Sequence, residues 1–225
     1  MSGSLASLER ALRYSFRDPG LLEQALTHRS AGSHNNERLE FLGDALLNLV
    51  IAEALFAAHE DVEEGGLSRL RASLVNQDAL AVLAQDLQLG EHLRLGPGEM
   101  KSGGQRRASI LADTLEAVLG AIHLDAGFEA VRTTVLSLFS EKLANPPALE
   151  DLKDAKTRLQ EWLQARNMAL PVYQVEAVSG EAHRQVFRVS CRIETSDLNT
   201  TGEAGSRRAA EQEAAGRALE RLLRD

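Results

Sequence analysis

The chain has 225 residues, of which 44% are hydrophobic and 26% are charged, and this composition is typical of a globular protein. No run approaches the roughly 18 apolar residues that a membrane span needs, so we expect no membrane partner. The formal net charge is −8, and the whole acidic excess falls within residues 1–150. The chain is long enough for two domains, and its uneven charge predicts two regions with different electrostatic roles.

The first residues lack the basic stretch and the apolar segment of a secretory signal, and we therefore expect a cytoplasmic protein. Cys191 is the only cysteine. This excludes an intramolecular disulfide and a zinc site built from several cysteines. We expect Cys191 to fill space in the core.

Between residues 5 and 143 the apolar residues recur mainly at helical spacing, and β-branched runs are scarce. This pattern predicts an all-α domain that spans residues 1–145. One long helix is expected to begin near Asn36, with an apolar stripe along one face. The stripe consists of Leu39, Leu42, Leu46 and Val50.

Glycine and proline mark the expected interruptions of the helical pattern. Segments 64–66 and 96–104 are rich in glycine and predict breaks between helices. The Asn-Pro-Pro sequence at 145–147 ends the pattern, because proline lacks a backbone donor and restricts the preceding residue. We therefore expect a short linker at about 145–152.

The periodicity changes after this linker. Asp154 is placed to cap a helix, and a strand is expected over residues 172–178. Apolar and polar residues alternate over 187–193, which predicts a second strand, and a weaker third strand is expected at 198–201. A final helix follows, with Ser206 as its cap. The expected order over residues 153–225 is α-β-β-β-α, a small α+β domain.

Three carboxylates are spaced to share one face of the long helix. On a helix that advances about 100° per residue, Glu37, Glu40 and Asp44 fall within an arc of roughly 60°. The apolar stripe borders this arc closely. We therefore expect these carboxylates at the edge of a packed core rather than wholly in solvent.

A second acidic pair, Asp113 and Glu116, interrupts an apolar helical segment at residues 110–120. Carboxylates crowded in a partly desolvated place repel one another, and a hard cation such as Mg²⁺, which prefers oxygen ligands, relieves that repulsion. Two such ions about 3.5–4 Å apart can activate a water and stabilise the leaving oxygen in phosphodiester hydrolysis. The acidic segments therefore fit metal-dependent phosphodiester hydrolysis.

Spacing alone leaves other interpretations of these acids open. A single glutamate in a charged helix more often belongs to a solvated helix face. A di-iron helix bundle is another metal-binding fold, but it expects Glu-x-x-His on its helices, and that tetrapeptide does not occur in this sequence. The sequence therefore disfavours the di-iron interpretation.

The block from Asn36 to Leu47 resembles the signature of the ribonuclease III family. The resemblance covers nearly the whole chain and continues through residues 68–72, 95–104 and 111–117. It implies an endonuclease that cuts duplex RNA as a homodimer and leaves 5′-phosphate and 3′-hydroxyl ends. It also implies a role in processing ribosomal RNA precursors and other structured RNAs.

The resemblance also implies roles for individual residues. Metal-dependent cleavage, with Mg²⁺ as the cofactor and Mn²⁺ as a substitute, would be carried by Glu40, Asp44, Asp113 and Glu116. Glu37 and Glu64 would help to organise the active site and the substrate, and Phe41 matches the family's dimer-contact position. Gly66 is a departure, because relatives can carry an additional acid in that loop.

Residues 153–225 resemble a double-stranded RNA-binding domain, which recognises shape, 2′-hydroxyls and phosphates across about 16 base pairs. The expected RNA-binding residues are Thr157, Gln160, Glu161, His183, Arg207 and Arg208. The two arginines open the last helix, where their charge and the free backbone N–H groups act together on phosphate. The family is often richer in lysine here, whereas this chain has Ala209 and Glu211, so we expect weaker or more salt-sensitive binding.

Other features of the sequence favour simpler interpretations. His28 stands beside Thr27 and Arg29 at an expected helix end, where a structural hydrogen-bonding role is favoured over a catalytic one. Gly96-x-Gly98 lacks the following Gly-Lys-Ser/Thr of a phosphate loop, so no nucleotide cofactor is expected. The main alternative function is a non-catalytic regulator that binds duplex RNA, and the intact carboxylate set argues against it. A metal-storage bundle leaves the arginine pair unexplained.

Overall fold

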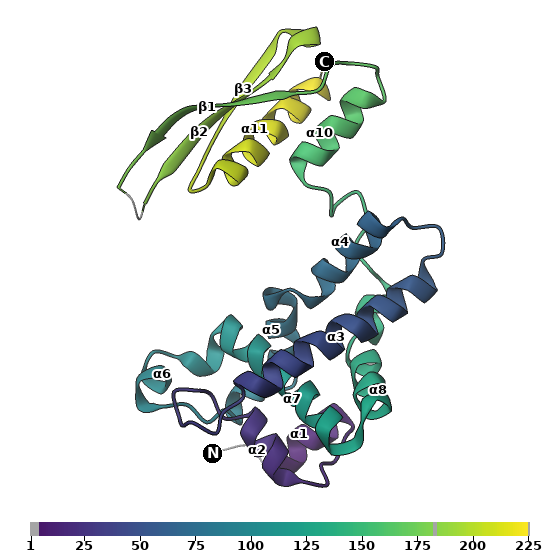
Figure 1. Ribbon diagram of the computed structural model, residues 1–225, viewed down its shortest axis with the longest axis vertical. Helices are drawn as coiled ribbons and strands as arrows, with labels where there is room; N and C mark the ends of the chain where they lie inside the picture. Colours follow the sequence, from purple (N-terminus) through teal and green to yellow (C-terminus); the bar gives the residue numbers. More distant parts are fainter. Residues whose placement is uncertain (1–4, 182–183, 225) are drawn as a thin grey trace. The chain divides into compact units, whose positions relative to one another are not determined.

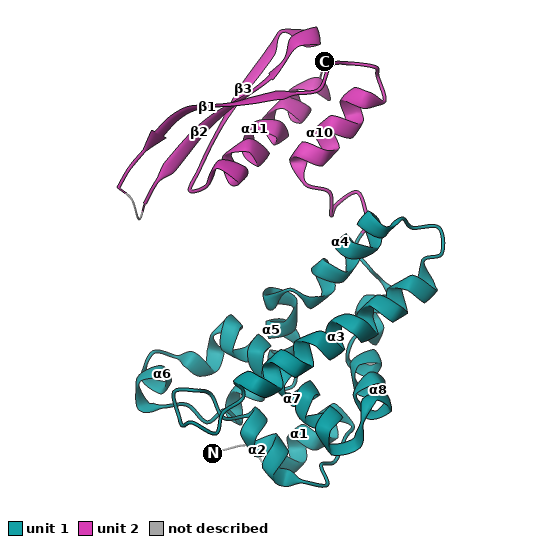
Figure 2. Cartoon of the chain, viewed as in Figure 1, with its two compact units in different colours: residues 1–147 teal, residues 148–225 magenta. Residues whose placement is uncertain are grey.

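The computed structural model describes residues 5–181 and 184–224 and divides the chain into two compact units, residues 1–147 and residues 148–225 (Figure 2). In its described residues, unit 1 is helical. Unit 2 combines one antiparallel sheet with two long helices. The predicted fold class, an all-α domain followed by a small α+β domain, is confirmed.

Unit 1 is built around two long helices, α3 and α7, which pack against each other (Figure 1). Its α-helices are α1 (Leu5–Leu12), α2 (Pro19–Ala25), α3 (Glu37–Ala58), α4 (Glu64–Val75), α5 (Gln77–Asp86), α6 (Pro97–Lys101), α7 (Ala108–Ala126), α8 (Phe128–Leu138) and α9 (Ser140–Ala144). Two short 3₁₀ helices, η1 (Leu89–Glu91) and η2 (Gly104–Arg106), lie between them. The start predicted near Asn36 is confirmed, since Asn36 is the N-cap of α3.

Two glycines bring the backbones of α3 and α7 close together. A Cβ atom at Gly43 would lie 1.7 Å from the carbonyl oxygen of Glu116, and one at Gly120 would lie 2.2 Å from the carbonyl oxygen of Leu39. Any side chain at either position would therefore force the helices apart. This close crossing places the first two turns of α3 directly against the middle of α7.

The prediction of a break at residues 64–66 is wrong. Gly65 and Gly66 lie in the first turn of α4, and the chain leaves helical geometry earlier, at residues 59–63. Glycine is tolerated in α4 because packing of the buried Leu70 and Leu74 stabilises the helix. The segment 96–104 is interrupted as expected, but it also contains α6 and the start of η2.

Helix α3 is apolar enough to cross a membrane by length and composition, with a mean hydropathy of 1.7 over an 18-residue window. Asp44, Asn48 and Glu53 interrupt this helix, so the expectation that the sequence holds no unbroken run of about 18 apolar residues stands. Only 33% of that window is buried in one copy of the chain. Phe41, Leu49 and Phe56 are 81%, 49% and 73% exposed, so α3 has a large apolar surface that unit 1 does not cover.

Unit 2 contains an antiparallel sheet of order β1-β2-β3 that packs against α11. Its elements are α10 (Ala155–Gln164), β1 (Val172–Ser179), β2 (Val186–Ile193), the 3₁₀ helix η3 (Glu194–Ser196), β3 (Leu198–Ala204) and α11 (Arg207–Leu222). The third strand is longer than predicted. The pairing of β1 with β2 is irregular between Val175 and Ala177.

The core of unit 2 joins both helices to the sheet. Leu159 and Leu163 from α10 are fully buried with Cys191 and Ile193 from β2, and Trp162 packs partly buried against them. The expectation that Cys191 fills the core is confirmed. Ser190 is also buried, with 8% exposure, so the face of β2 predicted to be polar is partly covered.

Side-chain caps fix the starts of the two helices of unit 2. The Asp154 side chain accepts a hydrogen bond of 2.9 Å from the backbone N–H of Thr157. The Ser206 hydroxyl accepts one of 3.2 Å from the backbone N–H of Ala209. These two bonds confirm both predicted caps. The caps could be predicted because capping depends on local sequence.

Candidate active site and nucleic-acid interface

The crossing of α3 and α7 brings three carboxylates together. One oxygen atom each of Glu40, Asp113 and Glu116 can be chosen so that all three lie within 4.8 Å of one another. All three side chains are partly buried. Glu40 comes from α3, and Asp113 and Glu116 lie one turn apart on α7. This spacing of oxygen ligands suits a hard divalent cation.

Burial raises the pKa values of all three carboxyl groups, and repulsion from neighbouring carboxylates adds to the rise for Glu40 and Glu116. Burial is the largest cause for Glu116, and with the charges of Asp44, Asp113 and Glu40 it raises the pKa to about 8. The pKa of Glu40 is raised by burial and then by Asp113 and Glu37. The pKa of Asp113 is raised by burial, and nearby His28 and Arg29 oppose the rise. A bound cation would relieve this repulsion, so the residues present fit a divalent metal.

Asp44 and Glu37 lie beside this cluster and are exposed. An oxygen of Asp44 accepts a hydrogen bond of 2.8 Å from the Asn48 amide, and the charge of Asp44 acts on both Glu40 and Glu116. Glu37 lies 3.5 Å from the guanidinium of Arg29. Arg29 therefore belongs to the surroundings of the cluster, a position that the sequence pattern did not reveal.

Glu64 lies away from the cluster, in the first turn of α4. Its Oε1 accepts a hydrogen bond of 2.8 Å from the Ser68 hydroxyl. It lines a cavity together with Ala52, Leu55 and Phe56 at the far end of α3. This end is about 20 Å along the helix from Glu40. Within one copy of the chain, the structure does not bring Glu64 to the other predicted acids.

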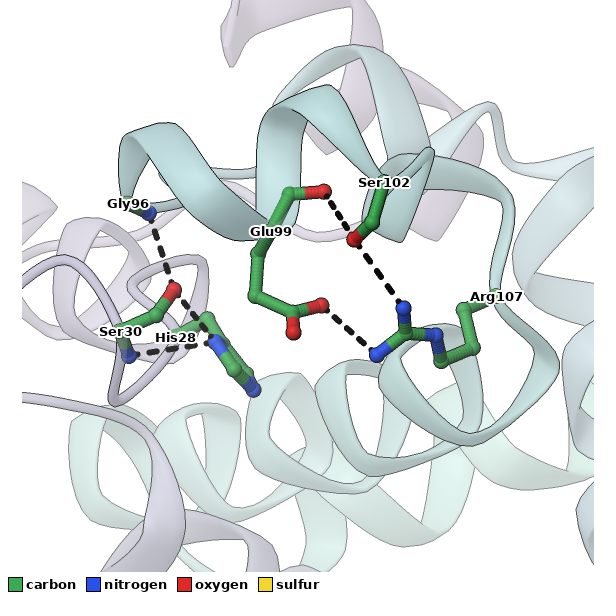
Figure 3. A network of polar contacts seen from close by, with 6 residues as sticks. All are labelled: His28, Ser30, Gly96, Glu99, Ser102 and Arg107. Atoms are coloured by element: carbon green, nitrogen blue, oxygen red, sulfur yellow. Dashed lines mark hydrogen bonds and ion pairs between the residues drawn. The ribbon is translucent and has the colours of Figure 1, made fainter.

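His28 takes part in a hydrogen-bond network at the edge of the cluster (Figure 3). The Ser30 N–H donates to His28 Nδ1 at 3.2 Å, so Nδ1 is the acceptor in this bond. The Ser30 hydroxyl lies 2.8 Å from Nδ1 and accepts a bond of 2.9 Å from the Gly96 N–H. In the same view, the Glu99 carboxylate accepts a bond of 2.8 Å from Arg107. These bonds tie residues 28–30 to the 96–107 segment.

Four of the six residues expected to bind RNA line one hollow on unit 2. They are Thr157, Gln160, Arg207 and Arg208. Glu161 lies on the same helix as Thr157, and its carboxylate is 2.6 Å from Lys153 Nζ. His183 lies outside the described residues.

The sequence did not predict an ion pair between Lys156 and Glu211, two residues that line this hollow. Lys156 Nζ lies 2.6 Å from the carboxylate of Glu211, which is 8% exposed. Glu211 is also 2.9 Å from Arg207 Nε. No local pattern could have shown the contact with Lys156, because the two residues belong to different helices that are far apart in the sequence.

Family models match both units of the chain. A model described as Ribonuclease-III-like matches residues 18–143, and a model of the double-stranded RNA binding motif matches residues 155–222. The chain belongs to the ribonuclease III family. The predicted family resemblance is thereby confirmed over nearly the whole sequence.

Curated members of the ribonuclease III family are similar along their full length. Ribonuclease 3 of Alkalilimnicola ehrlichii is 56% identical, over 96% of this chain and 95% of its own. Ribonuclease 3 of Hahella chejuensis is 55% identical, over 97% of both chains. A solved nuclease domain of ribonuclease III from Campylobacter jejuni has a TM-score of 0.60 and 49% identity, and the match covers 61% of this chain and 97% of that one.

Membership in the ribonuclease III family establishes the class of activity. The chain is an endoribonuclease that acts on double-stranded RNA, and the family's dependence on a divalent metal fits the carboxylate cluster of Glu40, Asp113 and Glu116. The alternatives of a non-catalytic regulator and of a metal-storage bundle are thereby set aside.

Proposed function

We propose that the domain at residues 1–145 hydrolyses phosphodiester bonds of duplex RNA with Mg²⁺, for which Mn²⁺ can substitute, held by Glu40, Asp44, Asp113 and Glu116. The main support is the convergence of three of these carboxylates, whose oxygens lie within 4.8 Å of one another. Further support comes from the pKa of Glu116, which burial and then the charges of neighbouring carboxylates raise to about 8, because a bound cation would offset both effects.

When bound, Mg²⁺ activates a water for attack and neutralises charge at the phosphate. The protein's own contribution is to hold these acidic side chains near one another on two helices whose backbones approach closely at Gly43 and Gly120. Ionised Glu116 would offer a carboxylate oxygen to the cation, and Asn48 would orient Asp44 through its amide. Glu37, beside the cluster, helps to organise the site, and Glu64, which lies away from the cluster in the same copy of the chain, helps to organise the substrate. The products carry 5′-phosphate and 3′-hydroxyl ends.

We assign RNA binding to the domain at residues 153–225. Thr157, Gln160 and Glu161 face a minor groove, and His183 reaches a neighbouring groove. Arg207 and Arg208 bind phosphate at the start of α11, where backbone N–H groups add to their charge. The substrates are ribosomal RNA precursors and other structured RNAs, and the enzyme acts in the cytoplasm.

We further propose that the enzyme is a homodimer in which Phe41 contacts the partner subunit. The apolar surface of α3 supports this, since Phe41 is 81% and Phe56 is 73% exposed in one copy. Large apolar side chains gathered on one helix are typical of an interface. A two-fold dimer would cover this surface on both subunits by the same contact.

Metal binding at the cluster can be tested without RNA. Mn²⁺ titrated into the metal-free protein is observed by electron paramagnetic resonance, for the natural chain and for Asp113→Asn. We expect Asp113→Asn to weaken Mn²⁺ binding by at least about tenfold, because one anionic ligand is lost. The control is Asp86→Asn, an exposed residue at the end of α5. Equal Mn²⁺ affinity for Asp113→Asn and Asp86→Asn would contradict the assigned site.

A further inference from the structure

The two helices of unit 2 supply different parts of the proposed RNA-binding surface. Thr157 and Gln160 on α10 are assigned to a minor groove, whereas Arg207 and Arg208 at the start of α11 are assigned to phosphate. Duplex RNA is recognised mainly by its shape, so the distance between these two parts must match an A-form helix. A contact that fixes α10 against the first turn of α11 therefore affects the selectivity between RNA and DNA duplexes.

Glu211 makes this contact through two ion pairs. Its Oε2 lies 2.6 Å from Lys156 Nζ on α10, and its Oε1 lies 2.9 Å from Arg207 Nε, one turn earlier on α11. Glu211 is 8% exposed, whereas the side chain of Arg207 is 64% exposed. Hydrogen bonding to Lys156 is the largest cause that holds the pKa of Glu211 below its ordinary value. The carboxylate therefore stays ionised at neutral pH.

The partners of Glu211 are held by further contacts. The backbone N–H of Lys156 donates a bond of 3.0 Å to Gln212 Oε1 on α11. Lys156 Nζ also lies 4.4 Å from the centre of the Tyr173 ring on β1. Lys156 is thus bound by α11 and by the sheet together. Glu211 binds Arg207 at Nε, the guanidinium nitrogen nearest the backbone. The terminal Nη donors of Arg207 are not used in this contact and can bind phosphate.

We propose that Glu211 is a positioning residue for duplex RNA: by holding Lys156 and Arg207 it sets the spacing between the minor-groove face of α10 and the phosphate site of α11. This spacing favours A-form RNA over B-form DNA. The inference rests on the proposed RNA-binding role of this surface and adds a determinant of its selectivity.

Positioning and simple electrostatics predict opposite effects when Glu211 is neutralised. If charge alone mattered, Glu211→Gln would tighten RNA binding, because one negative charge near phosphate would be removed. If Glu211 positions Arg207 and Lys156, the same substitution weakens RNA binding. Binding to duplex DNA changes little, because non-specific phosphate contacts do not require a fixed spacing between α10 and Arg207.

The experiment measures binding of the full chain, in EDTA to prevent cleavage, to an RNA duplex of about 24 base pairs and to DNA of the same sequence. We expect Glu211→Gln to weaken RNA binding about tenfold and to lower the RNA-to-DNA affinity ratio by the same factor. Glu220→Gln, an exposed acid farther along α11, is the control and should change neither affinity. Unchanged or tighter RNA binding by Glu211→Gln would overturn the inference.

A double substitution, Arg207→Gln with Arg208→Gln, separates this inference from the proposed function. If it weakens RNA binding while Glu211→Gln does not, only the positioning role is wrong. If neither change affects RNA binding, the RNA-binding role of the surface is wrong and the inference fails with it.

A second variant covers the case in which Glu211→Gln does not fold. Lys156→Met combined with Glu211→Met replaces the ion pair with apolar side chains, a change that often leaves stability unaltered. Thermal unfolding reports whether the fold is kept. We expect this folded variant to lose selectivity for RNA over DNA, because Arg207 is no longer held. An RNA-to-DNA affinity ratio equal to that of the natural chain would contradict the positioning role.

Discussion

Substitution of Glu116 by Gln should separate catalysis from RNA binding. The change nearly preserves shape but removes one negative charge from a cluster whose oxygens lie within 4.8 Å of one another. Weaker metal coordination and poorer neutralisation of the charge that develops at the phosphate each raise the activation barrier of cleavage by several kcal/mol. Each 1.36 kcal/mol is tenfold in rate, so we expect cleavage to fall by about a thousandfold or more.

The same substitution should stabilise the metal-free fold at high pH. The pKa of Glu116 is raised from 4.5 to about 8, mainly by burial and then by its acidic neighbours. A group whose pKa is raised on folding contributes its full stability below pH 4.5 and loses it as the pH rises to about 8. The resulting loss in the free energy of unfolding at pH 8 has an upper limit of about 5 kcal/mol. Screening by solvent at this partly exposed carboxylate reduces it to about 1–2 kcal/mol.

Paired measurements test both effects of Glu116→Gln. Cleavage and gel-shift titrations with duplex RNA should show lost cleavage and retained binding. Thermal unfolding in EDTA should show a higher melting temperature than the natural chain at pH 8 and a smaller difference at pH 5. Glu60→Gln, at an exposed position, is the control. Near-normal cleavage would remove Glu116 from the catalytic set, and joint loss of folding and binding would indicate a structural role.

Three further predictions concern the domains and their assembly. A chain ending at Pro146 should keep metal-dependent cleavage at low salt and lose it as salt rises, because phosphate contacts of the missing domain release counterions; equal salt resistance of the short and full chains would contradict this. Ala209→Lys should tighten RNA binding and steepen its salt dependence by about one counterion, and an unchanged slope in a filter-binding titration would refute it. Phe41→Asp should shift the sedimenting species from dimer to monomer at micromolar concentration, and a natural chain that is monomeric and fully active would refute the dimer.

Helical periodicity predicted part of the active site and could not predict the rest. The spacing of Glu37, Glu40 and Asp44 correctly indicated a shared edge of one helix, since this depends only on local geometry. The structure places Glu40 in the cluster and leaves the other two exposed. That division is set by the crossing of α3 and α7 at Gly43 and Gly120. Such a contact between distant segments leaves no periodic pattern in the sequence.

The RNA-binding domain shows the same contrast between local and distant effects. The caps at Asp154 and Ser206 could be predicted because each side chain bonds a backbone N–H three residues on. The ion pair of Lys156 with Glu211 could not be predicted, because it joins α10 and α11, which are separated in the chain by all three strands of the sheet. From the sequence, Glu211 is only a negative charge that weakens binding, whereas its burial between Lys156 and Arg207 supports the proposed positioning role.

Metal-dependent cleavage of duplex RNA by the full chain can be tested in one assay. A labelled RNA duplex is incubated with the purified protein in Mg²⁺ or in EDTA, and the products are resolved on a gel with their end groups identified. We predict cleavage in Mg²⁺ alone, with products that carry 5′-phosphate and 3′-hydroxyl ends. Cleavage at an equal rate in EDTA, or an intact duplex in Mg²⁺, would show that the protein is not a metal-dependent ribonuclease.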